Sequence, residues 1–250
     1  MALCIVIMRK EIFTILLIMC GLGAKAQFND STHHLFRYDI TGLLNKTNDT
    51  RSYVINTGIN FTINKKRFAL YSSSNWVYGR NGDDLSNNDF SSGLTLDYLK
   101  EVQKLYYWAL ANYATSYSLK IDYQVQAGGG IGYNFVNKPE FELVVSDGLL
   151  YEAGRVEPSA TEKDEYQTVR NSLRVKHRLS VRDIITLSGT HFWQPSLEAF
   201  DDYVIRSVTT CSIKLKKWLS ISAGLTYNRI SRTNRENLLI TAGISVEKYF

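Results

Sequence analysis

From Leu35 onward, apolar and polar residues alternate along the chain in segments of roughly ten residues. In the segment 51–63, for example, the odd-numbered residues are mostly apolar, whereas the even-numbered ones include Asn56, Gly58 and Asn60. Short clusters of Asn, Asp, Lys, Gly or Pro separate the segments, as they do between strands. Because successive side chains of a strand point to opposite faces, the pattern predicts strands with one apolar and one polar face.

The alternation predicts about twelve strands, with bounds uncertain by about two to four residues. They cover residues 35–44, 51–63, 67–79, 90–99, 104–114, 118–135, 140–152, 168–179, 184–194, 202–214, 218–230 and 237–250. An even number of strands suits a single-chain bacterial barrel whose two termini lie on the same side of the membrane.

Three features favour a membrane barrel over a secreted or periplasmic β-barrel or sandwich. The apolar face persists for about ten residues per segment, the length that crosses a bilayer at a tilt. The last segment alternates in phase from Leu238 to Val246 and, after a break at Lys248, ends in the aromatic Phe250, which resembles the signal recognised by the barrel-assembly machinery. Aromatic residues lie near segment ends, where rings settle at the headgroup level; they are Phe68, Trp76, Tyr78, Tyr98, Trp193, Tyr203 and Tyr227. We therefore predict a single transmembrane, antiparallel up-and-down β-barrel.

The composition agrees with this class and excludes others. Hydrophobic residues make up 44% of the 250 residues and the mean hydropathy is −0.18, unlike a protein with several apolar helices. The net charge of +5 is mild and no basic run is present, so no nucleic-acid partner is expected. Cys211 is the only cysteine beyond Cys20, too few for an internal disulfide or a structural zinc site. No cofactor or metal is predicted.

The N-terminus has the pattern of a secretory signal. Arg9 and Lys10 precede the apolar stretch 12–22, which is followed by small residues up to Ala26. The stretch is short for a membrane span. A retained anchor helix and lipoprotein processing at Cys20 are the alternatives. The predicted organisation is a signal peptide, 1–26, cleaved after Ala26, and a barrel, 27–250. The predicted location is the outer membrane of a Gram-negative bacterium, in contact with its lipid and lipopolysaccharide.

The hairpin 127–152 carries a family resemblance. It contains a strand end at Gly130–Tyr133, a tight turn at Asn137–Pro139 and a second strand with Gly148. This arrangement resembles the YdiY-like family of salt-induced outer-membrane proteins, which is also called domain of unknown function 481. The resemblance extends from about residue 30 to the end; it implies a bacterial outer-membrane barrel and supplies no catalytic residues. No helix pattern follows the glycines 128–132, so we interpret them as sites of strand bending or close packing rather than as a phosphate-binding loop.

Four cations share the polar phase of one predicted strand, and two carboxylates lie on its neighbour. They are Arg170, Arg174, Lys176 and Arg178, with Glu140 and Glu142. Two interpretations remain open. In the first, the lumen is filled by paired charges, because a buried cation requires a partner. In the second, the cations form a basic constriction that admits anions.

The first and last predicted strands also carry charges that should meet where the barrel closes. Arg37 and Asp39 lie on the first strand, and Glu247 lies on the last. We interpret this set as fixing the register of closure.

The favoured function is therefore structural or the passage of small polar or anionic solutes, without catalysis. One alternative is an outer-membrane hydrolase of lipid or peptide, with His191 and the pair Asp201-Asp202 activating a water. His177 falls on the lipid-facing phase. Another alternative is a surface-binding barrel that acts through acidic outer loops, which are predicted at 80–89, 153–167 and 195–202.

Overall fold

The computed structural model describes residues 33–46, 51–65, 67–99, 104–159 and 162–249, which form thirteen strands and no helix. The predicted signal peptide, 1–26, and the predicted assembly signal Phe250 lie outside these residues. Within the described ranges, no helix is long and apolar enough to span a membrane.

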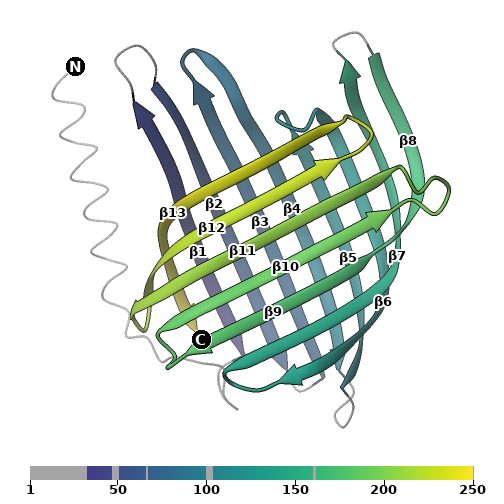
Figure 1. Cartoon of the computed structure of the whole chain (residues 1–250). Coiled ribbons are helices and arrows are strands. Elements are labelled where there is room, and N and C mark those ends of the chain that lie inside the picture. Colours follow the sequence, from purple (N-terminus) through teal and green to yellow (C-terminus); the bar gives the residue numbers. More distant parts are fainter. Residues whose placement is uncertain (1–32, 47–50, 66, 100–103, 160–161, 250) are drawn as a thin grey trace.

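The strands follow one another along the chain with short connections (Figure 1). They are β1 (His34–Lys46), β2 (Arg51–Lys65), β3 (Phe68–Asn81), β4 (Asp84–Leu99), β5 (Leu105–Ser116), β6 (Ile121–Asn137), β7 (Phe141–Ser159), β8 (Glu162–Asn171), β9 (Leu173–Val181), β10 (Ile185–Pro195), β11 (Tyr203–Lys216), β12 (Leu219–Ile230) and β13 (Arg235–Tyr249).

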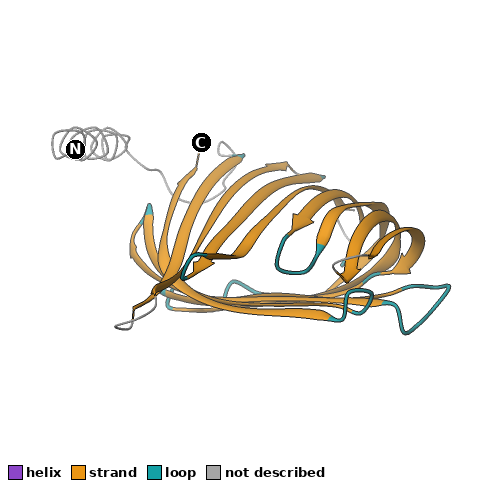
Figure 2. Cartoon of the chain, turned by 90° about the horizontal axis from the view of Figure 1, so that it is seen from above, coloured by secondary structure: helices purple, strands orange, loops and turns teal. Residues whose placement is uncertain are grey.

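The strands form one antiparallel sheet that closes on itself, because β1 pairs with β13 and β6 pairs with β7. Both β8 and β9 pair with β7, on either side of Ser172, and together they act as one crossing strand. The described residues thus build a closed barrel of twelve crossing strands, which confirms the predicted fold (Figure 2). We call the end where β1 begins and β13 ends the terminal end, and the opposite end the loop end.

Two of the three predicted outer loops differ in the structure. Most of 80–89 and 153–167 belongs to strands, since β4 begins at Asp84, β7 continues to Ser159 and β8 begins at Glu162. Polar residues occupy both faces of these hairpin tips, so the alternation that marks a strand disappears there. The region 195–202 is a loop, as predicted.

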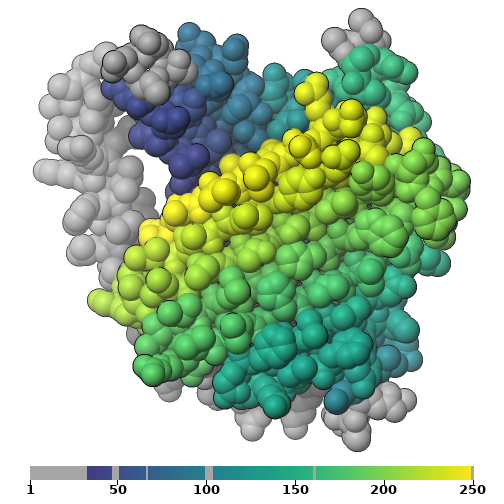
Figure 3. Space-filling view, in the orientation of Figure 1, coloured from purple at the N-terminus to yellow at the C-terminus, as the bar shows by residue number. Residues whose placement is uncertain are grey.

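The outer surface of the barrel is apolar. Phe68 pairs with Tyr98 near the terminal end, where their ring centroids lie 5.1 Å apart, and Trp76 lies 5.7 Å from Tyr78 toward the loop end. Phe68 and Tyr78 are ten residues apart on β3, about 33 Å along a strand. At a tilt of about 40° this corresponds to a height of about 25 Å, the height of the apolar band of membrane barrels. Figure 3 shows part of this outer wall, where the side chains of β9–β13 pack side by side.

Large side chains fill the lumen next to β5–β7, and glycines make room for them. Gly130 and Gly148 lie opposite each other on β6 and β7, and the Trp108 indole from β5 covers both. A Cβ atom at Gly148 would lie 2.6 Å from the Trp108 ring, and one at Gly132 would lie 2.2 Å from the Tyr106 ring. The glycines therefore allow the aromatic rings to lie flat on the inner wall.

Two apolar clusters lie in the lumen, one next to β5–β7 and one that also reaches β11 and β12. One contains Tyr106, Trp108, Val144 and Leu150, and the other contains Leu119, Ile121, Val156, Tyr166, Val204 and Ile230 near the loop end. The residues of the first cluster face inward, so the lumen next to β5–β7 is a packed core rather than a channel.

Candidate functional site in the barrel lumen

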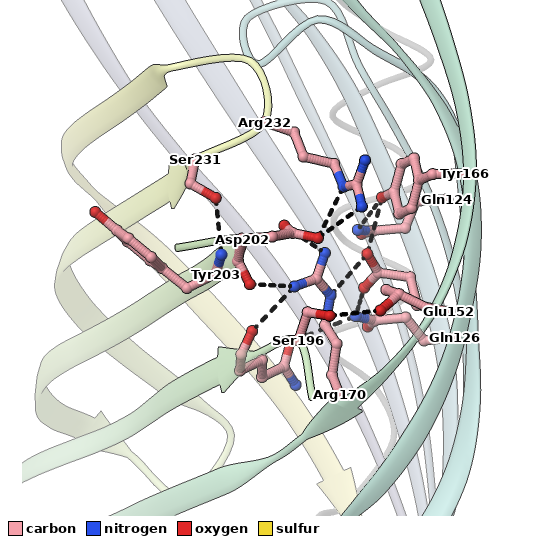
Figure 4. Close-up of polar contacts among 12 residues, drawn as sticks. Gln124, Gln126, Glu152, Tyr166, Arg170, Ser196, Asp202, Tyr203, Ser231 and Arg232 are labelled. Atoms are coloured by element: carbon pink, nitrogen blue, oxygen red, sulfur yellow. Dashed lines mark hydrogen bonds and ion pairs between the residues drawn. The ribbon is translucent and has the colours of Figure 1, made fainter. Parts of the chain in front are cut away.

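A buried ionic cluster lies between the two apolar clusters, with Arg170 of β8 at its centre (Figure 4). The Arg170 guanidinium binds Glu152 of β7 at 2.9 Å and the Asp202 carboxylate at 3.0 Å. The side chains of Arg170, Glu152 and Asp202 are 0%, 0% and 9% exposed. A charge this deeply buried is stable only when it is paired and hydrogen-bonded, and Arg170 meets both conditions.

Neutral polar groups complete the coordination of Glu152. The Tyr166 hydroxyl donates to Glu152 Oε1 at 2.8 Å, and Gln126 Nε2 donates to Glu152 Oε2. The Gln126 amide also donates to Gln194, whose own amide donates to Ser172 at 3.0 Å. We call this set the lumen network; its members are Gln124, Gln126, Glu152, Tyr166, Arg170, Ser172, Gln194, Asp202 and Arg232.

The lumen network depends on a loop that folds into the barrel mouth. The loop between β10 and β11 pairs with β8 through an isolated bridge between Ser196 and Arg170, and the Leu197 amide donates to the Val169 carbonyl at 2.8 Å. Arg232, in the turn between β12 and β13, holds the Asp202 carboxylate at 2.8 Å (Figure 4). The network thus joins strands on opposite sides of the barrel and closes one part of the lumen.

The predicted charge ladder is divided between different environments. Arg170 belongs to the lumen network, whereas Arg174 donates to Ser146 and to the Tyr106 hydroxyl, each at 2.8 Å. Lys176 lies 3.4 Å from Glu142, and Arg178 lies opposite Glu142 in the register of β7 and β9. Glu140 lies exposed in the turn before β7. The four cations therefore do not form one ring of free charge.

The other side of the lumen contains three cavities in a row. The loop-end cavity has a volume of about 390 Å³, the middle cavity about 170 Å³ and the terminal-end cavity about 570 Å³. The first two share Asn56, Asn75, Val208 and Thr226, and the last two share Arg37. The row runs from Ser118 and Asn237 at the loop end to Asp183, Lys214 and Glu247 at the terminal end.

The predicted closure residues lie along this row of cavities. Arg37 lies opposite Glu247 in the register of β1 and β13, and its guanidinium binds Asp39 at 2.9 Å and Ser245 at 3.2 Å. Asp39 also accepts hydrogen bonds from Asn60 of β2 and Ser245 of β13. Side chains from three adjacent strands therefore meet at the carboxylate of Asp39.

The residues of the hydrolase alternative do not come together. His191 lies on the outward face of β10, where its Nδ1 atom is 2.7 Å from Ser207 Oγ and its ring stacks on His177 at 5.3 Å. Asp202 is buried in the lumen network, and Asp201 is exposed in the loop. Among the described residues, no group of three or more His, Cys, Asp or Glu side chains is arranged to hold a metal ion.

Sequence reasoning missed the partners of Arg170. Gln124 and Gln126 share the polar phase of the segment 118–135, and the structure places both side chains in the lumen. The alternation gives no sign that Asp202 meets Arg170 there, because Asp202 reaches the lumen through a loop of irregular backbone. Glu152 does share the inward phase of β7, and this was the one available signal.

These features define a transmembrane-type β-barrel with an apolar outer surface and a polar, partly filled lumen. Residues 39–238 match the family described as "Protein of unknown function, DUF481". The chain belongs to this family, which confirms the resemblance found in the hairpin 127–152. No curated protein sequence matches the chain.

The chain is similar to solved structures at low sequence identity. The NanC porin is 9% identical, with a TM-score of 0.54 over 85% of this chain and 98% of the porin. The translocator domain of the autotransporter NalP from Neisseria meningitidis is 12% identical, with a TM-score of 0.49 over 96% of this chain and 94% of that domain. At such identities the likeness to the porin concerns the fold alone.

Proposed function

We propose that the protein is an outer-membrane barrel that provides a narrow, polar passage for small solutes. The row of three cavities between the two ends of the barrel carries this proposal. The lining of the middle cavity is mostly Ser, Thr and Asn, which exchange hydrogen bonds with water and polar solutes. The proposal assigns no reaction, cofactor or metal to the chain.

The outer surface supports a place in a bilayer. Its apolar band and its two levels of aromatic rings match those of outer-membrane barrels. The fold shared with the NanC porin is compatible with transport. We further propose that the signal peptide 1–26 directs export and that the barrel-assembly machinery inserts the barrel into a Gram-negative outer membrane. There the barrel would contact lipopolysaccharide, with its terminal end facing the periplasm.

Conductance in planar bilayers tests the proposal, with the purified protein and a variant that blocks the row of cavities. Gly224 lines the middle cavity, and nothing lies closer than 3.5 Å to a Cβ atom placed on it. Gly224→Phe should therefore fill the middle cavity and abolish most of the current. Leu225→Phe is the matched control, because Leu225 is the next residue on β12 and faces outward.

Steady current in the wild-type and the Leu225→Phe protein, and its loss in Gly224→Phe, supports a passage through these cavities. Folded wild-type protein that gives no current and also admits no small solute into proteoliposomes contradicts the proposal. Equal current in all three proteins would place the conducting path elsewhere and contradict it as well.

A further inference from the structure

The loop-end and middle cavities meet at four side chains, Asn56 of β2, Asn75 of β3, Val208 of β11 and Thr226 of β12, which we call the junction. We propose that the junction is the selectivity constriction of the barrel and that it favours small uncharged, hydroxyl-bearing solutes over ions. This inference rests on the proposed function and adds a solute class to it.

Two polar atoms at the middle cavity lack a partner within the protein. The Asn56 amide oxygen and the Thr41 hydroxyl are both buried and form no hydrogen bond to the protein. Both residues line the middle cavity, and Asn56 also belongs to the junction. A buried polar atom without a partner is costly, so these atoms favour a guest that brings hydrogen-bond donors of its own. Water and hydroxyl groups have that property.

The charge at the middle cavity is internally compensated. Among the described residues that line it, the charged ones are Arg37 and Asp39, which bind each other at 2.9 Å. The remaining lining is uncharged, with hydroxyl groups such as those of Thr210 and Thr241. An ion that loses hydration here finds no free opposite charge, whereas a neutral solute exchanges its hydrogen bonds with water for hydrogen bonds with Ser, Thr and Asn.

The size of the middle cavity sets the size of the solute. Its volume of about 170 Å³ is that of a cavity that holds a few water molecules or one small solute. Glycerol and pentoses are in this range. The cavities at both ends are larger, so we place the constriction at the middle cavity and its junction.

Swelling of proteoliposomes that contain the full-length protein tests the inference, with glycerol and arabinose as neutral probes. Gluconate and glucosamine serve as charged probes close to a sugar in size. We expect the wild-type protein to admit both neutral probes at least about tenfold faster than either charged probe, as a neutral constriction requires. In a salt gradient the K⁺-to-Cl⁻ permeability ratio should lie within about twofold of one.

Asn56→Asp places an unpaired carboxylate at the junction in a side chain of the same shape. It should raise the K⁺-to-Cl⁻ permeability ratio by about fourfold to tenfold, the effect of one charge in a partly hydrated pore. Asn64→Asp is the matched control, because Asn64 shares the inward phase of β2 but lies eight residues away at the terminal end. Its ratio should change by less than about twofold, since solvent and salt screen the charge there.

Thr226→Val keeps the shape of the side chain and removes a hydroxyl from the junction. It should slow arabinose entry by about threefold or more, because a lost hydrogen bond is not replaced. The outward-facing Thr209→Val is its control. This pair tests the junction even if Asn56→Asp fails to assemble.

The outcomes separate the two proposals. If no probe enters and no current flows, the passage itself is refuted and the inference falls with it. If current flows but charged probes enter as fast as arabinose, or if Asn56→Asp and Asn64→Asp behave alike, the junction is not the constriction and only the inference is refuted.

Discussion

The strongest test of the lumen network is the replacement of Arg170 by methionine, which has a similar length but no charge. Arg170→Met leaves Glu152 fully buried without its cationic partner. Asp202 keeps one cation, because Arg232 binds its other carboxylate oxygen at 2.8 Å. The largest part of the cost should therefore come from the lost pair between Arg170 and Glu152.

The expected magnitude follows from the contacts of the guanidinium. Removal of one partner from a buried ion pair costs about 3–5 kcal/mol, since an uncompensated charge remains. Arg170 also donates to the backbone carbonyls of Asp202 at 3.0 Å and of Gln194 at 3.3 Å, and these bonds disappear too. Water that enters from the neighbouring cavities would hydrate Glu152 in part. We therefore expect the free energy of unfolding to fall by about 3 kcal/mol, the lower end of that range.

Chemical unfolding of the protein in lipid vesicles, followed by tryptophan fluorescence, measures this change. Glu152→Gln and the double variant Arg170→Met/Glu152→Gln complete a double-mutant cycle. The double variant should be more stable than the sum of the single effects predicts, because no unpaired charge remains. Arg178→Met is the matched control, since Arg178 is an exposed cation on the same crossing strand. A loss below about 1 kcal/mol for Arg170→Met, the level of a surface ion pair, would refute the reasoning.

Three further predictions concern the wall of the barrel. Gly148→Ala should strongly reduce the folded fraction, because the added Cβ atom would clash with backbone atoms and with the Trp108 indole. Gly58→Ala should fold normally, because no atom lies closer than 3.5 Å to a Cβ atom placed there. Heat-modifiable gel mobility measures the folded fraction of both variants. Asp39→Ala should impair assembly more than Glu247→Ala, because Asp39 accepts hydrogen bonds from three strands. Equal effects of the two variants in the same assay would contradict this prediction. His191→Leu should change the free energy of unfolding by less than about 1 kcal/mol, since a polar ring on the lipid-facing surface does not stabilise the folded barrel. A loss of stability above about 3 kcal/mol would contradict this prediction.

The sequence predicted the wall of this barrel far better than its contents. Alternation over ten or more residues identifies a strand and its two faces, so the twelve crossing strands and the inward phase of residues such as Asn56 and Gly58 could be derived. The same rule failed at the hairpin tips near Asp84 and Ser159, because both faces of a strand meet water beyond the apolar band.

The lumen network was beyond sequence reasoning for a different reason. Arg170 was expected among four inward cations, and its phase was correct. Its partners come from β7 and from a loop about thirty residues later in the chain, and only the closed barrel brings them together. Periodicity defines the face of a side chain, whereas an ion pair across a lumen depends on the curvature and register of the whole sheet.

The location of the proposed passage follows from the sizes of the inward side chains. On β5 the inward residues include Tyr106 and Trp108, and these rings fill the space over the glycines of β6 and β7. On β12 the inward residues include Ser222 and Gly224, and a cavity remains beside them. A closed twelve-stranded wall has enough room for both arrangements, so the contrast between large and small inward residues decides which part is core and which part is lumen. The packed part, tied together by Arg170, then fixes the shape of the wall around the junction. Loss of the network should therefore disturb solute selectivity as well as stability, whereas a change at the junction should alter selectivity alone.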